Sequence, residues 1–131
     1  TYNPTQRRQL ERSTASHNTV QIGDYEQSEV WSSFRVARRT SPSITKDTSS
    51  QIEASLKYAT RSANHKRKFA FFEEGILIHD EIIGSEEGRA YLHFHPDIKI
   101  KLTENTILTN LDYIICMRGH SDRDQKISKC E

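Results

Sequence analysis

The sequence predicts an all-β fold, an antiparallel β-sandwich of about nine short strands. Apolar and polar residues alternate over several short runs, which is the period of a half-buried strand. Turn-forming residues separate these runs at a spacing of roughly 8–12 residues, which is typical of sandwiches and barrels. No 3.6-residue period persists for three turns, so the pattern does not favour a long helix.

The length and composition indicate one globular domain without a strong overall charge. The chain has 131 residues, a hydrophobic fraction of 34% and a mean hydropathy of -0.79. Tyr, Phe, Ile and Leu nevertheless recur throughout, whereas disordered chains are depleted of them. The net charge of +1 gives no global field for nucleic acid or an anionic membrane. No apolar run approaches the ~18 residues of a transmembrane span, so we expect neither nucleic acid nor membrane as a partner.

Three regions differ in composition. Residues 1–16 are polar and unpatterned, and we expect an incoming loop at the edge of a cleft. Residues 17–117 carry the strand pattern and form the predicted sandwich domain. Residues 118–131 are a polar tail that we expect to fray. Because the chain begins with Thr1 in loop-like sequence, we expect it to be a fragment of a larger protein.

The first half of the chain is predicted to contain three strands and one long loop. Alternation and turn residues predict a strand over 18–22, a strand over 28–38, a Ser/Thr-rich loop over 40–50 and a strand over 51–58. In the second of these strands, Trp31 and Arg35 fall on the same face, which permits stacking of the cation on the ring.

The second half is predicted to begin with a hairpin. Strand-forming residues over 66–72 and 76–83 flank the turn Glu73-Glu74-Gly75. Residues 89–100 alternate again, but Pro96 interrupts the hydrogen-bond ladder, so we expect an edge, a bulge or a split into two strands. Shorter strands follow over 106–108 and 111–117.

His17 is the first candidate for chemistry. It lies in the segment 12–20, which combines a basic residue, several hydroxyls, a histidine and an amide just before a strand. A neutral imidazole there serves as a metal ligand or a general base. The alternative is a loop histidine whose ring bonds to the backbone, since one histidine does not make a zinc site.

Other histidines and basic residues allow two interpretations each. His93 and His95 are two positions apart, so on a strand they would share a face and a metal, with His79 as a third ligand. The alternative is the polar outer face of a sheet. The run 66–68 contains Arg67, which could bind a carboxylate or sulfate bidentately, or could belong to a solvated edge strand.

The two cysteines decide little. Cys116 and Cys130 form neither a CxxC motif nor a Cys/His metal spacing, and they are compatible with one disulfide or with two thiols. Motifs for serine hydrolases, phosphate-binding loops and HExxH zinc sites are absent from the sequence.

Several segments together resemble a known family. They are RSTASHNTV at 12–20, QSEVW at 27–31, SFRVARR at 33–39, HKR at 65–67, ILIHDE at 76–81 and LHFHP at 92–96. In this order they resemble the heparinase II/III-like polysaccharide lyases, over roughly residues 1–100. The resemblance implies an upstream helical toroid, C-terminal antiparallel β-sheets, and cleavage of uronic-acid-containing polysaccharides by β-elimination.

The resemblance also implies roles for particular residues. His17 matches a histidine that joins an upstream His and Asp to hold a structural divalent metal, zinc above all. Tyr2 corresponds to a catalytic cleft tyrosine, and Arg12 and Asn18 would contact substrate beside the cleft. The main catalytic groups would lie upstream, so this chain alone is expected to be inactive.

The resemblance leaves the substrate open. Glycosaminoglycans such as heparan sulfate, alginate and other acidic polysaccharides are all compatible with it. By analogy with degradative lyases, the location is expected to be periplasmic or secreted. An alternative function is a non-catalytic carbohydrate-binding or structural β module that uses Trp31, Tyr91 and basic strands.

Overall fold

The computed structural model describes residues 5–31, 35–59, 62–84, 87–104, 106–111 and 114–116. Its chain divides into two compact units, residues 1–93 and residues 94–131, which are described separately below. Within the described ranges, no helix is long and apolar enough to cross a membrane. Every strand pair in both units is antiparallel, so the all-β antiparallel prediction is confirmed.

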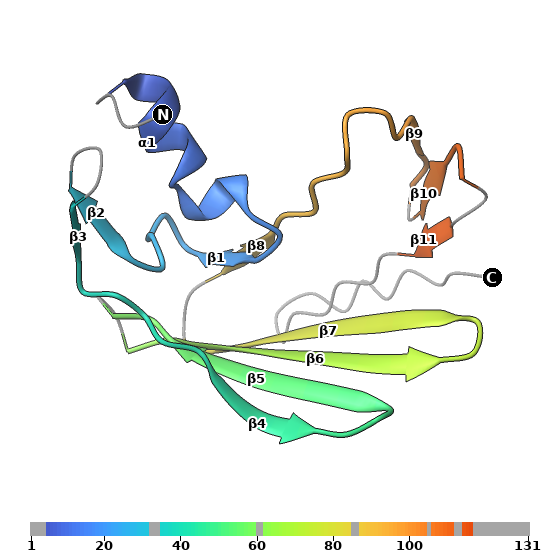
Figure 1. Cartoon of the computed structure of the whole chain (residues 1–131), viewed down its shortest axis with the longest axis horizontal. Helices are drawn as coiled ribbons and strands as arrows, with labels where there is room; N and C mark the ends of the chain where they lie inside the picture. Colours follow the sequence, from blue (N-terminus) through green and yellow to red (C-terminus); the bar gives the residue numbers. More distant parts are fainter. Residues whose placement is uncertain are drawn as a thin grey trace. The chain divides into compact units, whose positions relative to one another are not determined.

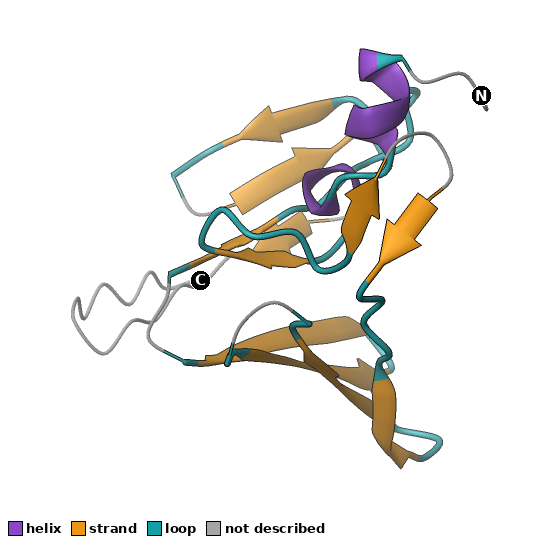
Figure 2. Ribbon diagram, turned by 90° about the vertical axis from the view of Figure 1, so that its left-hand side faces the viewer, coloured by secondary structure: helices purple, strands orange, loops and turns teal. Residues whose placement is uncertain are grey.

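A four-stranded sheet is the largest element of the first unit. Its strands are β4 (Ser43–Asp47), β5 (Gln51–Lys57), β6 (Asn64–Phe72) and β7 (Gly75–Ile83), in that spatial order (Figures 1 and 2). The β6–β7 hairpin pairs all nine residues of each strand around the turn at 73–74. The predicted hairpin is therefore confirmed, and the tight turn fixes which residues face one another across it.

Two smaller strand pairs complete the first unit. β1 (Val20–Ile22) pairs with β8 (Gly88–Ala90), which lies far away in the sequence. β2 (Glu29–Trp31) pairs with β3 (Arg35–Ala37) as a hairpin. One continuous strand was expected over 28–38, and this expectation is wrong. Residues opposite each other in an antiparallel pair lie on the same face of the sheet. Trp31 and Arg35 therefore share a face in this hairpin, as they would in one continuous strand, and the alternation of apolar and polar residues does not distinguish the two.

The core lies where β1 meets the larger sheet. Val20, Ile22, Tyr58 and Ala63 are buried there, and Tyr25, Leu56 and Ile82 pack against them. The Tyr58 hydroxyl donates to the Val20 carbonyl at 2.7 Å and accepts from the Ile22 amide at 3.2 Å. Both bonds are buried, so the Tyr58 hydroxyl attaches the main chain of the short strand β1 to the sheet.

Two further segments differ from the expected ones. Residues 1–16, expected as an incoming loop, contain the helix α1 (Gln6–Glu11), which the Thr5 side chain caps by accepting from the Arg8 amide. The expected loop over 40–50 contains β4, an exposed edge strand with a bulge between Ile44 and Lys46. Ser and Thr are compatible with a solvated edge, so their abundance did not exclude a strand.

The second unit contains a three-stranded sheet in the order β11-β10-β9. Its strands are β9 (Ile100–Leu102), β10 (Thr106–Thr109) and β11 (Ile114–Cys116). Residues 91–99 form no strand, so the run over 89–100 is split as Pro96 led us to expect. The expected tail over 118–131, Cys130 and the side chain of Cys116 lie outside the described residues.

Candidate functional site

Residues 13–19, here called the histidine loop, join α1 to β1. They include the 3-10 turn η1 (Thr14–Ser16), in which Thr14 is buried. The Thr14 amide donates to the Glu26 carboxylate at 2.5 Å, and the Thr14 hydroxyl accepts from the Gln27 amide at 2.8 Å. The first half of the loop is therefore held by the segment that precedes β2.

The second half of the loop is held from the other side. The Asn18 side chain accepts from the His93 amide at 2.6 Å and donates to the His93 carbonyl at 3.5 Å. The His93 ring donates through Nε2 to the Ala15 carbonyl at 2.8 Å and stacks on the Tyr91 ring. The Arg67 guanidinium donates through Nη1 to the Asn18 carbonyl at 2.6 Å. Residues on both sides of His17 thus have fixed partners.

His17 itself is exposed. Its main chain bonds within the loop, to Thr14 and Thr19, but among the described residues no hydrogen bond involves its imidazole. The alternative expectation, a ring bonded to backbone, is therefore not what the described part of the chain shows. An accessible imidazole nitrogen without a partner is the donor that zinc takes from histidine.

One imidazole is an incomplete metal site. Across the described ranges, no three His, Cys, Asp or Glu side chains lie close enough together to hold a metal ion. The chemistry of His17 fits a divalent metal, but further ligands must come from outside these residues. His17 as a metal ligand, with zinc as the metal, therefore stays a prediction.

Asp80 on β7 forms a charged network with His65 and Arg67 of the neighbouring strand β6. It accepts from Arg67 at 2.7 Å and 2.9 Å and from His65 Nε2 at 2.6 Å. Burial alone would raise the pKa of Asp80, but the bonds from His65 and Arg67 and the Arg67 charge outweigh it. The pKa of Asp80 is lowered to about 2, so the carboxylate is charged and binds Arg67 bidentately at neutral pH.

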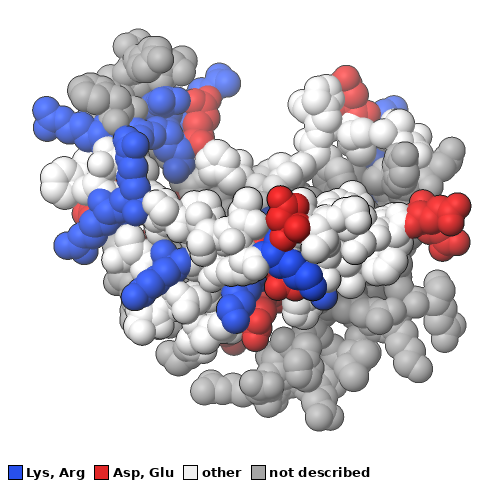
Figure 3. All heavy atoms as spheres, turned by 60° about the horizontal axis from the view of Figure 1, so that its bottom comes forward, with Lys and Arg blue, Asp and Glu red and all other residues white. Residues whose placement is uncertain are grey.

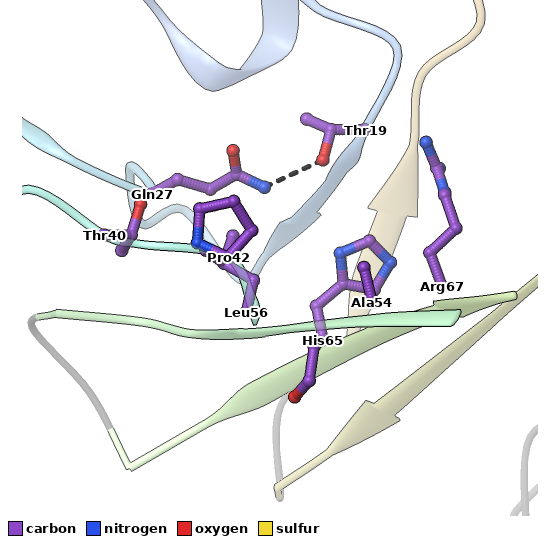
Figure 4. Close-up of a pocket in the computed structure, with 9 residues that line it drawn as sticks. Thr19, Gln27, Thr40, Pro42, Ala54, Leu56, His65 and Arg67 are labelled. Carbon is purple, nitrogen blue, oxygen red and sulfur yellow. Dashed lines mark hydrogen bonds between the residues drawn. The ribbon is translucent and has the colours of Figure 1, made fainter. Parts of the chain in front are cut away.

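A cavity of about 280 Å³ lies beside this network (Figure 4). Residues of β5 and β6, among them Ala54, His65 and Arg67, line one side of it, and Thr19 and Gln27 line another. The Gln27 amide nitrogen donates to the Thr19 hydroxyl at 2.8 Å. The cavity therefore borders the C-terminal end of the histidine loop.

Arginines gather at one end of the first unit. Figure 3 shows Lys and Arg side chains clustered on the side that carries α1, β2 and β3. The arginines of these elements and the adjoining segments, here called the arginine cluster, are Arg7, Arg8, Arg12, Arg35, Arg38 and Arg39. Arg7 pairs with Glu11 at 2.8 Å, and Arg38 pairs with Glu29 at 3.5 Å. A chain with a net charge of only +1 thus has a local cationic region.

The other predicted site residues have different surroundings. Arg12 is the half-buried C-cap of α1, and its amide donates to the Gln9 carbonyl at 3.3 Å. Asn18 uses both ends of its side-chain amide on His93. Tyr2 lies outside the described residues.

The histidines considered as a metal pair or triad have other surroundings in the described part of the chain. His93 bonds to the Ala15 carbonyl, His95 lies 3.5 Å from the Asp97 carboxylate, and His79 is exposed on β7. Residues 91–95 form no strand, so the assumption of a shared strand face is wrong. The edge strand expected around 66–68 is also wrong, because β6 is an inner strand of its sheet.

The sequence analysis missed the network of His65, Arg67 and Asp80. A signal for it was present: the turn at 73–74 pairs Phe72 with Gly75, and counting back along both strands places Arg67 opposite Asp80. Opposite charges directly across a hairpin attract each other. The bond from Arg67 to the Asn18 carbonyl had no such local signal.

Comparison with protein families decides the classification. The model of the Heparinase II/III-like, C-terminal family matches residues 1–128. The chain belongs to this family. This heparinase II/III-like C-terminal domain is thus a member of a polysaccharide lyase family, as the sequence motifs led us to expect. No curated protein and no solved structure matches the domain.

Proposed function

We propose that this domain is the C-terminal β part of a lyase that cleaves uronic-acid-containing glycans by β-elimination. The domain contributes a metal-site histidine, His17, and the edge of the cleft, while the main catalytic groups lie in an upstream helical toroid. The observation that carries the proposal is the exposed imidazole of His17, which bonds to none of the described residues, on a loop held on both sides in a chain of this family.

The proposed reaction breaks the bond between C4 of the uronate and its glycosidic oxygen. A base takes the proton from C5, the electron pair forms the C4–C5 double bond, and an acid gives a proton to the departing oxygen. The charge that develops on the uronate carboxylate has to be neutralised in the transition state. Among the site residues predicted here, Tyr2 would take part in proton transfer, and Arg12 and Asn18 would lie next to the substrate.

His17 would hold the metal through a neutral imidazole nitrogen, together with an upstream His and Asp. A bound zinc ion would supply a fixed positive charge and join this domain to the upstream part. The residues of the histidine loop keep the imidazole exposed for that purpose. Zinc is the expected cofactor because imidazole and carboxylate together suit it.

The arginine cluster supports an acidic glycan as substrate. Guanidinium groups bind carboxylate and sulfate bidentately, and a net charge of +1 means that attraction has to be local. The substrate could be a glycosaminoglycan, alginate or another uronate polymer. A periplasmic or secreted location is part of the same proposal, and cell fractionation with an antibody against the protein would test it.

The test is an ultraviolet assay for unsaturated uronate products. The intact protein is incubated with a panel of acidic glycans, and metal content is measured for wild type and for His17→Ala. We expect absorbance to rise with at least one glycan, and bound zinc to be lost in His17→Ala. His79→Ala is the matched control, since His79 is also exposed but belongs to β7 and not to the histidine loop. The protein with this substitution should keep its zinc.

A second candidate function is a non-catalytic carbohydrate-binding module. Trp31 favours it: the indole is 57% exposed, and its Nε1 donates to Glu29 at 2.8 Å, which restrains the ring. Arg35 lies directly across the hairpin from Trp31. Glycan binding by the intact protein that is lost in Trp31→Ala, without unsaturated product from any glycan, would favour this function over the lyase.

A further inference from the structure

We propose that Arg67 and Asn18 are positioning residues for His17. They hold the main chain on both sides of His17, which fixes the place from which its imidazole can join ligands from the proposed upstream part of the protein. This inference rests on the proposed function, because it concerns the same metal site. It assigns to Asn18 a role within the protein in addition to the expected proximity to substrate.

Arg67 connects the loop to the inner part of the sheet. Its Nε and Nη2 donate to the two oxygens of Asp80, and its Nη1 donates to the Asn18 carbonyl at 2.6 Å. Two bonds to one carboxylate fix the plane of the guanidinium group. The third nitrogen is then fixed as well, so the position of the Asn18 carbonyl follows from that of β6 and β7.

His65 strengthens this arrangement from the buried side. It is 5% exposed and bonds to Asp80 Oδ1 at 2.6 Å. Asp80 is therefore restrained by two residues of the inner strand β6. A residue whose own rotamer is locked by a buried partner transmits little motion to the group that it holds.

Asn18 connects the loop to the segment that follows β8. Its side-chain amide bonds to both the amide and the carbonyl of His93, as a neighbouring strand would. The His93 ring donates a hydrogen bond to the Ala15 carbonyl at 2.8 Å. The main chain is thus restrained two residues before His17 and one residue after it.

These bonds serve the loop rather than the attachment of β1. Tyr58 already ties β1 to the sheet through the Val20 carbonyl and the Ile22 amide. The bonds from His93 and Arg67 go instead to the carbonyl groups of Ala15 and Asn18, on the two sides of the exposed His17, which contributes nothing to the core. Loss of a group that hydrogen-bonds directly to a metal ligand typically costs about 10–100-fold in metal binding. Groups that hold the main chain around the ligand should act in the same direction.

The experiment measures the zinc dissociation constant of the intact protein by competition with a chelator. We expect Asn18→Ala and Arg67→Gln to bind zinc more weakly than wild type, with a loss of up to about 10–100-fold, the range for groups bonded directly to a metal ligand. Tyr58→Phe is the matched control: it removes two buried hydrogen bonds next to the loop and should lower the melting temperature while leaving zinc affinity unchanged. The zinc affinity of Arg67→Lys should fall between those of wild type and Arg67→Gln, since one ammonium cannot reproduce the planar contact with its three hydrogen bonds.

Hydrogen exchange provides a readout that does not depend on metal. Without zinc, the peptide covering 13–20 should exchange faster in Asn18→Ala and Arg67→Gln than in Tyr58→Phe. Zinc affinities of these two variants equal to that of Tyr58→Phe, with His17→Ala weakened, would overturn the positioning role alone. Unchanged zinc binding in His17→Ala would instead overturn the proposed metal role and this inference with it.

Discussion

Asp80 is the residue whose charge state has the clearest consequence for stability. In the folded chain its pKa is about 2, below its ordinary value of 3.8, because hydrogen bonds from His65 and Arg67 outweigh the effect of burial. A lowered carboxyl pKa stabilises the folded state above the ordinary pKa, and this contribution is lost as the pH falls through the folded value. We expect Asp80→Asn to reduce the free energy of unfolding by about 2 kcal/mol at pH 7.

The pH dependence provides the check on this prediction. Urea unfolding at several pH values should show that the difference between wild type and Asp80→Asn shrinks from pH 4 towards pH 2. Asp47→Asn is the control, because Asp47 is exposed on the edge strand β4; it should change stability by less than about 0.5 kcal/mol. A difference for Asp80→Asn that persists undiminished at pH 2 would show that the charge of Asp80 is not its cause.

Among the strands, the pairing of β1 with β8 depends on the small size of Gly88. A Cβ atom at this position would lie 1.9 Å from Ile82 Cδ1 and 3.0 Å from Val20 Cγ1. Both contacts belong to the region where β1 packs on the larger sheet. Gly88→Ala should therefore lower stability by about 1–3 kcal/mol, the usual range for overpacking.

Gly75→Ala is the matched control for this substitution. Gly75 also begins a strand, but a Cβ atom there would have no neighbour within 4 Å. Thermal unfolding followed by circular dichroism should show a lower midpoint for Gly88→Ala and little change for Gly75→Ala. Equal midpoints would mean that Ile82 moves aside without cost and that the packing at Gly88 is not tight.

The same elements show how far the sequence predicts the fold. The β6–β7 hairpin and its register follow from local alternation and one tight turn, so both could be predicted. The pairing of β1 with β8 could not, because three-residue strands carry little pattern and their partner is distant in the chain. The same holds for the candidate site. His17 could be singled out from the sequence, whereas the contact of Arg67 with Asn18 could not, because the two residues are 49 positions apart.

The proposed division of labour can be tested by comparing this domain alone with the intact protein that we propose contains it. The elimination needs a base, an acid and a group that neutralises the uronate carboxylate. The histidine loop offers one exposed imidazole, and the described residues hold no metal cluster that could add to it. We expect the 131-residue chain to give no unsaturated product on a glycan that the intact protein cleaves. Product formed by the chain alone would place the catalytic groups within it.

The proposed β-elimination can be tested on the intact protein with one glycan in two forms, native and carboxyl-reduced. Reduction of the uronate carboxyl groups to alcohols removes the carbonyl group that acidifies the C5 proton and accepts its electron pair, so elimination becomes unfavourable. Hydrolysis of a glycosidic bond does not require that carboxyl group. We therefore expect the intact protein to cleave the native glycan with formation of unsaturated product and to leave the carboxyl-reduced glycan uncut. Both substrates should be followed by ultraviolet absorbance and by chain length. Shortening of the reduced glycan without absorbance would point to hydrolysis and would contradict the lyase mechanism, whereas binding of both glycans without shortening of either would favour the binding module built around Trp31.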